Sequence, residues 1–490
     1  MMARVPEGAA RKCLLGALVL GSALLSGDGA LAGVDDSRCP SNAIAIEPGT
    51  LIQAVADRAG VGASFCLKNG THRAQAVRPL PKQQFYGEGR TVLNGSRLLT
   101  GFRREENFWA VNIRLQPSRK HGECLPSAPT CNQPEALFVD DRPLTRVGSK
   151  TALTGGKFFI DYAGGKVYLG DDPVKRKIEL TVASFAFEST ANDVLIRNIT
   201  VEKFASAAQK GAIHAREGTR WIIENCEARL NSGAGLSVGN GSRVHNCDVH
   251  HNGQIGIEGN GNDILIERSR IWANNIYGFD ATWEAGGVKI ALSDGVTFRG
   301  NHVYGNDGPG LWCDIDCRNV LYEENLVENN QDVGIFHEIS FKAVIRNNVL
   351  RRNGFGDRGW FWGADILLAA SENVVVTDNT LTVAPGRCGI ILIDQGRRNS
   401  DGRLYKTRNN IVRANNMTFE GAACAGGTSD TKPGSENFSI ITDGGNLFDG
   451  NTYRVPEQAG PARFVWGQDV GDWGEFRRRG LEQSGRLIFL

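Results

Sequence analysis

Two short segments of the sequence set carboxylates at matching positions. The segment GPGLWCDIDC at residues 308–317 alternates apolar and polar residues as a β-strand does, which places Trp312 and Asp314 on one side. The segment GIFHE at residues 334–338 follows the same pattern and brings Glu338 to the position of Asp314. On neighbouring parallel strands the two residues would lie about 5 Å apart. Two carboxyl groups this close can divide acid–base work, because burial and mutual repulsion keep one protonated while the other stays ionised.

Such a pair is what the hydrolysis of a glycosidic bond requires. A carboxyl separation near 5 Å, as the strand spacing predicts, favours the retaining route through a covalent intermediate. We expect Glu338 to be the acid/base and Asp314 the nucleophile, and the reverse assignment stays open.

A lysine offers a competing chemistry. Lys289, in the segment GVKI at residues 287–290, would lie one strand below Asp314 and one pleat along. In β-elimination or C5 epimerisation of a uronate, Lys289 or a tyrosine would take the C5 proton. A calcium ion held by Asp314, Asp316 and Glu338 would then neutralise the substrate carboxylate.

The strands that position these groups belong to a repeat with a period in the low twenties. Seven segments align, each apolar at both ends and followed by a turn rich in Asn or Gly. Their shared column holds Cys226, Cys247, Ser269, Asn301, Asn325, Asn348 and Asn379. Inward asparagines in such a column can bond to their own turns and to one another across rungs.

A second strand, opened by glycine, recurs between these segments at Gly235, Gly256, Gly287, Gly310, Gly334 and Gly389. The chain has 61 glycines and no helical pattern between the strands. We predict an all-β fold in which a single chain coils as a solenoid of parallel strands. The alternative, a large β-sandwich, would need hairpin turns between neighbouring strands.

Two rungs are longer than the others. Ser269 to Asn301 spans 32 residues and Asn348 to Asn379 spans 31, against 21 to 24 for the other rungs of this column. The extra residues fall at the same place in each rung, so we predict two loops, at 274–286 and 353–363, that wall a groove. The predicted substrate-binding residues are Asp280, Trp283 and Glu284 from the first loop, Trp360 and Trp362 from the second, and Trp312, Phe336 and Asp365 from the strands between.

Composition excludes one class of partner. The formal net charge is +1, from 55 basic and 54 acidic residues, which gives no basic field to hold a nucleic-acid backbone. We therefore expect no nucleic-acid partner.

The N-terminus has the features of a Sec-type signal peptide over residues 1–32. Arg4, Arg11 and Lys12 precede an apolar run at 13–25, and Ala30-Leu31-Ala32 offers a cleavage site. No later segment approaches the roughly 20 apolar residues of a membrane span. We predict a secreted or periplasmic protein.

The remaining chain divides by pattern. We predict an N-terminal helical cap and first rungs at 33–135, with the helix at 48–60, and an inserted β-module at 136–180, where alternation is strong and Gly-Gly turns occur. The coil follows at 181–451, and a C-terminal tail and cap at 452–490.

Ten cysteines remain after cleavage of the signal peptide, an even number that predicts disulfides in an oxidising compartment. The absence of any C-x2-C pair in the sequence argues against zinc. Cys226 and Cys247 share a column on adjacent rungs, so they would bridge or stack. Proximity in sequence pairs the others as Cys39 with Cys66, Cys124 with Cys131, Cys313 with Cys317 and Cys388 with Cys424. The 313–317 bridge would require the strand to end near Asp314 and turn.

The repeat columns from Asn192 to Asn451 resemble those of secreted right-handed parallel β-helix proteins of the pectin-lyase-like superfamily. The resemblance implies a right-handed coil and a glycan ligand, because members are mostly polysaccharide lyases, glycoside hydrolases, epimerases and carbohydrate-binding proteins. The stretch YGFDATWEAG at 277–286 is similar to a Tyr-Gly-x-Asp-Pro-His stretch of alginate epimerases, with Ala281-Thr282 in place of Pro-His.

Three functions follow from these patterns. The first is a monomeric, secreted glycoside hydrolase that acts on a polysaccharide or oligosaccharide and needs no cofactor. The second is a polysaccharide lyase or uronate C5-epimerase that uses Lys289 with calcium. The third is a non-catalytic glycan-binding or envelope-structural coil, since an outward carboxylate on such a fold is most often a solvated surface group.

Overall fold

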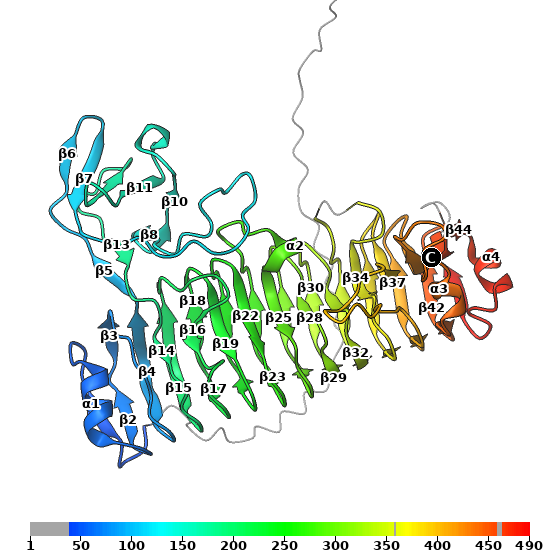
Figure 1. Ribbon diagram of the computed structural model, residues 1–490, viewed down its shortest axis with the longest axis horizontal. Coiled ribbons are helices and arrows are strands. Elements are labelled where there is room, and N and C mark those ends of the chain that lie inside the picture. The colour runs from blue at the N-terminus through cyan, green and yellow to red at the C-terminus, as the bar shows by residue number, and fades with distance from the viewer. Residues whose placement is uncertain (1–38, 357–358, 458–462) are drawn as a thin grey trace, which may run out of the picture. The chain divides into compact units, whose positions relative to one another are not determined.

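A stack of parallel strands forms the body of the protein (Figure 1). The computed structural model describes residues 39–356, 359–457 and 463–490, so the predicted signal peptide lies outside the described residues. Each rung contributes up to three strands, and each strand pairs in parallel with its counterparts one rung below and one rung above. The coil predicted from the repeat columns is confirmed.

The strands form three stacks that run along the coil. The first stack contains β1 (Ile44–Ile46), β2 (Ser64–Leu67), β4 (Gln84–Asn94), β15 (Leu195–Glu202), β17 (Ile222–Glu224), β20 (Arg243–His245), β23 (Leu265–Glu267), β26 (Thr297–Arg299), β29 (Arg318–Glu323), β32 (Phe341–Arg346), β35 (Val375–Thr377), β38 (Ile411–Arg413) and β41 (Leu447–Asp449). The second stack shares the long strands β4 and β15 and adds β3 (Gly70–Arg73), β18 (Glu227–Arg229), β21 (Asp248–His250), β24 (Arg270–Trp272), β27 (His302–Tyr304), β30 (Leu326–Glu328), β33 (Val349–Arg351), β36 (Thr380–Val383), β39 (Asn416–Phe419), β42 (Thr452–Val455) and β45 (Arg486–Phe489). The third stack contains β14 (Phe187–Glu188), β16 (Gly211–His214), β19 (Ala234–Val238), β22 (Ile255–Asn260), β25 (Gly286–Ala291), β28 (Leu311–Asp314), β31 (Ile335–Glu338), β34 (Ala364–Ala369), β37 (Cys388–Asp394), β40 (Cys424–Ser429) and β43 (Arg463–Gly467), and ends in the antiparallel β44 (Asp469–Gly471).

A tight corner joins the first stack to the second in each rung. The residue before the asparagine column has a positive φ, as at Glu324 (57°), Asn347 (55°) and Asp378 (57°). This left-handed residue bends the chain without a loop, and the side chain of the next residue points into the coil. The interior between the stacks is filled by Val, Ile, Leu and Phe side chains that alternate with outward residues along each strand.

The inward asparagines form two hydrogen-bonded ladders. In each, an Asn Nδ2 donates to the Asn Oδ1 of the next rung at 2.9–3.0 Å. The first ladder comprises Asn301, Asn325, Asn348, Asn379, Asn415 and Asn451, and the second comprises Asn231, Asn252, Asn274, Asn306, Asn330 and Asn353. The predicted column is confirmed and continues for two rungs beyond Asn379.

Each ladder ends on a buried carboxylate. Asn353 Nδ2 donates to Asp365 Oδ1 at 2.8 Å, and Asn451 Nδ2 donates to Glu482 Oε1 at 2.7 Å. Asp365 is 1% exposed, and burial raises its pKa to about 7. The prediction that Asp365 faces the groove is wrong, because its side chain turns inward to accept the last amide of the second ladder.

Replacing Asn379 with Ala is expected to lower the free energy of unfolding by about 3 kcal/mol or more. The Asn379 side chain makes five hydrogen bonds inside the coil, and its loss removes the acceptor of the Asn348 backbone N–H and a donor to the Ile345 carbonyl. Urea unfolding followed by circular dichroism measures the effect. The control is Thr380→Ala, at an exposed position next in the chain; equal destabilisation by both variants would contradict a structural role for the ladder.

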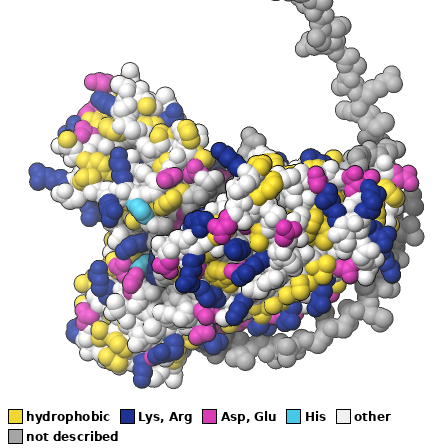
Figure 2. All heavy atoms as spheres, turned by 45° about the vertical axis from the view of Figure 1, so that its right-hand side comes forward, with side chains coloured by type: hydrophobic (Ala, Val, Ile, Leu, Met, Phe, Trp, Pro, Cys, Tyr) yellow, Lys and Arg dark blue, Asp and Glu magenta, His cyan; other side chains and the backbone are white. Residues whose placement is uncertain are grey.

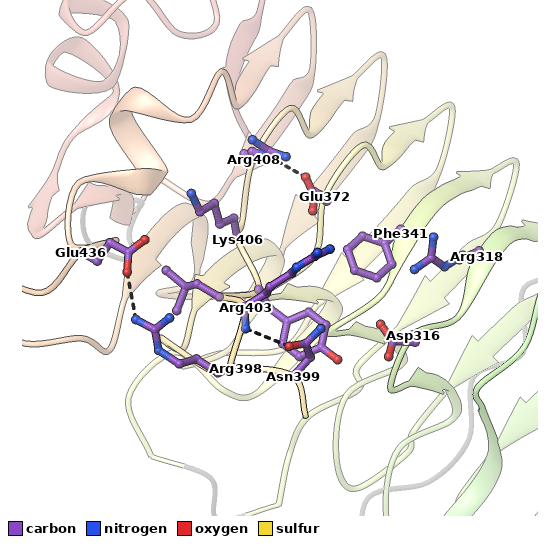
Figure 3. A pocket seen from close by; sticks show the side chains of 12 residues that line it. Asp316, Arg318, Phe341, Glu372, Arg398, Asn399, Arg403, Lys406, Arg408 and Glu436 are labelled. Atoms are coloured by element: carbon purple, nitrogen blue, oxygen red, sulfur yellow. Dashed lines mark hydrogen bonds and ion pairs between the residues drawn. The ribbon is translucent and has the colours of Figure 1, made fainter. Parts of the chain in front are cut away.

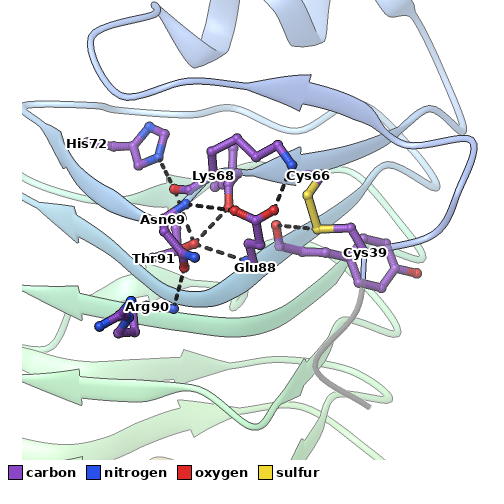
Figure 4. Close-up of a disulfide and its surroundings, with 10 residues drawn as sticks. Cys39, Cys66, Lys68, Asn69, His72, Glu88, Arg90 and Thr91 are labelled. Carbon is purple, nitrogen blue, oxygen red and sulfur yellow. Dashed lines mark hydrogen bonds and ion pairs between the residues drawn. A yellow bond between two sulfur atoms is a disulfide. The ribbon is translucent and has the colours of Figure 1, made fainter. Parts of the chain in front are cut away.

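Three of the predicted disulfides are confirmed: Cys39–Cys66, Cys124–Cys131 and Cys388–Cys424. Figure 4 shows the first of them, beside the Lys68–Glu88 ion pair of the first rungs. The third links adjacent rungs of the third stack, where the two cysteines are paired in register. These bridges fit an extracellular protein.

The other four cysteines are free and buried. Cys226 and Cys247 stack as thiols on adjacent rungs, which is one of the two predicted outcomes. The predicted Cys313–Cys317 bridge is wrong. The strand does end at Asp314 and the chain does turn, but the Cys317 thiol bonds to the Ile290 and Asp314 carbonyls instead.

Both ends of the coil are covered. At the N-terminal end, α1 (Ile52–Ala59) buries Ile52 and Ala56 against the first rung and ends at Gly60, whose φ is 81°. At the C-terminal end, α3 (Ile440–Asp443) and α4 (Trp473–Arg478) pack beside β43, and Asp472 begins α4 with a capping box. The predicted N-terminal helix is confirmed.

The β-module consists of two small sheets beside the first rungs (Figure 1). Its elements are β5 (Ser96–Leu98), β6 (Arg103–Glu105), β7 (Phe108–Asn112), β8 (Leu137–Val139), β9 (Arg142–Pro143), β10 (Thr145–Arg146), a 3₁₀ turn at Lys150–Ala152, β11 (Lys157–Asp161), β12 (Lys166–Leu169) and β13 (Ile178–Thr181). Because β5, β6 and β7 pair with these strands, the module also takes in residues 96–112, ahead of the predicted range of 136–180.

The surface carries both signs of charge. On the face in Figure 2, Lys and Arg side chains are interspersed with Asp and Glu, consistent with a net charge of +1. Within the described ranges, none of the helices has the length and apolar character needed to cross a membrane.

Candidate active site

The third stack carries the predicted catalytic residues on its outer face. Lys289, Trp312 and Phe336 are paired in register on β25, β28 and β31. Cys313 and His337 are the next pair in register, and they point inward. Asp314 and Glu338 therefore follow one position along and point outward on adjacent strands, about 4.8 Å apart at the backbone. The alternation predicted from the sequence is confirmed here.

Asp314 is held by a cation and a backbone amide. The Lys289 Nζ lies 3.0 Å from Asp314 Oδ2, and the Ile315 N–H donates to Asp314 Oδ1 at 2.8 Å. Both contacts fix the orientation of the Asp314 carboxyl group. Only 7% of the Asp314 side chain is exposed, so these contacts act away from bulk water.

Lys289 is enclosed by partners that stabilise its charge. Besides Asp314, it pairs with Glu284 Oε2 at 3.5 Å and donates to the Trp283 carbonyl at 3.3 Å. Its ammonium also lies 3.9 Å from the centre of the Trp312 ring. These contacts hold the Lys289 side chain against the stack, and Lys289 is not among the residues that line the groove described below.

Glu338 has the properties of a general acid. Burial and the neighbouring Asp314 charge raise its pKa to about 7, and together they outweigh the Arg397 guanidinium, which donates to Oε1 at 2.6 Å. A carboxyl group with this pKa is partly protonated near neutral pH. This raised pKa is the property that the predicted acid/base role of Glu338 requires.

A groove of about 460 Å³ opens over this part of the stack. Its lining residues are Thr282, Trp312, Phe336, Glu338, Gly359, Trp362, Gln395 and Arg397. Trp312 and Phe336 stack with ring centres 5.3 Å apart and form an apolar floor, while Trp362 comes from the second predicted loop. Asp314 lies beneath this surface and is not among the lining residues.

The remaining predicted binding residues have other contacts. Trp283 packs against Phe279 and His121, and Trp360 is half exposed and packs on Phe361. Asp280 begins the short helix α2 (Ala281–Glu284) by accepting the Thr282 N–H, and Glu284 accepts from Gln209 at 2.8 Å. The first loop therefore contributes Thr282 to the groove, rather than its tryptophan and acids.

Gln395 and Arg397 also line the groove, although neither is among the predicted site residues. They lie in the loop between β37 and β38, which joins the groove from a third side. The sequence does indicate a third loop here, because the rung from Asn379 to Asn415 has 36 residues and is longer than the rungs of 32 and 31 residues that predict the other two loops.

The three residues predicted to hold calcium are engaged elsewhere. Asp314 pairs with Lys289, Glu338 pairs with Arg397, and Asp316 lies beside the Tyr405 hydroxyl. Across the part of the chain that the structure describes, no group of three or more His, Cys, Asp or Glu side chains is arranged to hold a metal ion. The three predicted ligands therefore do not form such a group in the described part of the chain.

Comparison with known proteins supports the fold. A family model described as "Right handed beta helix region" matches residues 185–282 and 211–381. A search of curated proteins gives no match. The solved complex of XylC with xylose is similar over 90% of this chain and 83% of its own, at 13% identity and a TM-score of 0.63. The A-module of Azotobacter vinelandii mannuronan C-5 epimerase AlgE6 is similar over 89% of this chain and 93% of its own, at 15% identity and a TM-score of 0.50. The chain therefore has the fold of a right-handed parallel β-helix, and residues 185–381 match the family model of that region.

Proposed function

We propose that the protein is a secreted, monomeric glycoside hydrolase of the retaining type. The observation that carries the proposal is the pair Asp314 and Glu338 on adjacent strands, the first ion-paired with Lys289 and the second with a pKa raised to about 7. The structural similarity to a XylC–xylose complex supports a sugar of small size in the groove, and the apolar floor of Trp312 and Phe336 suits a sugar ring.

In the first step the Asp314 carboxylate attacks the anomeric carbon while Glu338 donates its proton to the departing glycosidic oxygen. The C1–O bond breaks, the leaving sugar departs as an alcohol, and a glycosyl ester forms on Asp314. In the second step Glu338, now a carboxylate, takes a proton from water as that water attacks C1. The ester bond breaks, and the sugar leaves with its original configuration and restores both residues.

Lys289 has a positioning role in this scheme. Its ion pair holds the Asp314 carboxyl group in place, and its cation–π contact fixes the Trp312 ring. Arg397 holds the Glu338 carboxyl in one orientation from the other side.

Release of reducing ends from a panel of polysaccharides and oligosaccharides tests this proposal. We expect release from at least one glycan without absorbance near 235 nm, which unsaturated uronates would produce. Absorbance without hydrolysis would support a lyase, and binding with neither signal would leave a glycan-binding protein.

The pH profile gives a further prediction. Because Glu338 must be protonated in the first step, kcat/KM is expected to fall as the pH rises through about 7. In Arg397→Gln the cation that opposes protonation is lost, so the pKa of Glu338 and the basic limb should both move to higher pH. A basic limb that stays unchanged in this variant would contradict the assignment of the acid.

A further inference from the structure

A second cavity, of about 550 Å³, lies on the other side of the loop that carries Arg397. Its walls hold five cationic and three acidic side chains (Figure 3). We call it the cationic pocket and define it by Arg318, Phe341, Arg403, Tyr405, Lys406 and the ion pairs described next. Its volume is in the range of sites for small molecules.

Each of the three acidic side chains of the cationic pocket has a partner within the pocket. Glu372 accepts from Arg408 at 2.5 Å, and Glu436 accepts from Arg398 at 2.9 Å. Asp316 lies beside the Tyr405 hydroxyl, a contact that adds to burial in raising the pKa of Tyr405.

Three cationic side chains of the cationic pocket have no carboxylate partner among the described residues. Among the described residues, no carboxylate lies within ion-pair distance of Arg318, Arg403 or Lys406. The Arg318 guanidinium lies over the Phe341 ring, 4.9 Å from its centre, and the Arg403 side chain extends toward the same ring in Figure 3. An apolar ring flanked by unpaired guanidinium groups is suited to a ligand that has both an apolar face and a negative charge.

The cationic pocket is close to the catalytic pair. Asp316 is two residues beyond Asp314, and the charges of Asp314 and Arg397 both act on Tyr405. The loop between β37 and β38 supplies Gln395 and Arg397 to the groove, and Arg398, Arg403 and Lys406 to the cationic pocket. One glycan chain could thus contact both sides of this loop.

We propose that the cationic pocket binds the carboxylate of a uronic acid residue, so that the glycan cleaved in the groove is an acidic one whose charged sugar lies beyond the scissile bond. This inference rests on the proposed function for its catalytic part, while the binding itself does not. It also gives separate roles to a groove with an apolar floor, where one acid faces one arginine, and to the cationic pocket next to it.

Calorimetric titration of the protein with glucuronate and galacturonate tests the inference, with their methyl esters and with acetate as comparisons. We expect at least one uronate to bind, its methyl ester to bind at least tenfold more weakly, and affinity to fall as salt screens the charges. Failure of both uronates to bind, or equal binding of acid and ester, would overturn the proposal. Acetate binding as tight as the uronate would reduce the site to a simple anion site and overturn its sugar specificity.

Two variants locate the binding. Arg403→Gln and Lys406→Gln are each expected to weaken uronate binding by about tenfold. The matched control is Arg413→Gln, an exposed arginine on β38 with no ion pair among the described residues, which should bind uronate as the parent protein does. Equal losses in all three variants would overturn the assignment to this cavity.

Because a free uronate has no bond to cleave, this experiment is independent of hydrolysis. Uronate binding without hydrolysis of any glycan would leave the cationic pocket in place and remove the proposed catalytic function. Hydrolysis of a glycan without uronate binding would support the catalytic function and overturn the proposed role of the cationic pocket.

Discussion

Replacing Glu338 with Gln is expected to reduce hydrolysis of glycans with unactivated leaving groups by about 10²- to 10⁴-fold. The amide oxygen can still accept the hydrogen bond from Arg397, so the local structure is retained. What is lost is the proton that Glu338 gives to the leaving oxygen, and later the base that activates water.

The nature of the leaving group separates this role from a structural one. The dinitrophenolate of a dinitrophenyl glycoside departs without protonation, so the first step should be nearly as fast in Glu338→Gln as in the parent protein. A burst of dinitrophenolate should then precede slow turnover. The matched control is Glu323→Gln, which removes a carboxylate that is also paired with arginine but lies on the first stack. Equal losses for both leaving groups would contradict the assignment of Glu338 as acid/base.

Replacing Asp314 with Asn is expected to reduce activity by about 10⁴-fold or more for every leaving group. The amide is no nucleophile, and no glycosyl ester can form on it. Because the Ile315 N–H and Lys289 remain nearby, a small anion such as azide should occupy the vacated charge position and attack C1 directly. The product would be a glycosyl azide of inverted configuration.

The control for this variant is Glu284→Gln, which removes the other carboxylate partner of Lys289. It tests whether loss of an ion pair on Lys289 is enough to abolish activity. We expect Glu284→Gln to retain most activity and to gain nothing from azide. Azide rescue in Glu284→Gln, or none in Asp314→Asn, would contradict the assignment of the nucleophile.

The sequence predicts the fold well because the coil imposes a strict repeat. Every rung must bring an apolar residue inward at the same places, and the corner must place an asparagine where its amide reaches the next rung. Asn325 and Asn348 occupy matching positions of two successive repeats, and their side chains are hydrogen-bonded in the structure. The outward direction of Asp314 and Glu338 is predicted by the same alternation of inward and outward residues.

Departures from the repeat were harder to predict. Asp365 alternates like an outward residue, but the second ladder needs a final acceptor, and only the three-dimensional path of the chain shows that Asp365 supplies it. Loop side chains escape prediction for the same reason: Trp283 turns away from the groove, and Arg397 reaches Glu338 across 59 residues of sequence.

The account depends most on a covalent bond between a sugar and Asp314, and this bond can be observed. In Glu338→Gln, an activated aryl glycoside should load the protein faster than water can release the sugar, so rapid acid quenching and peptide mass mapping should find the glycosyl group on Asp314. No adduct during turnover, or an adduct on another residue, would contradict the proposed catalytic pair.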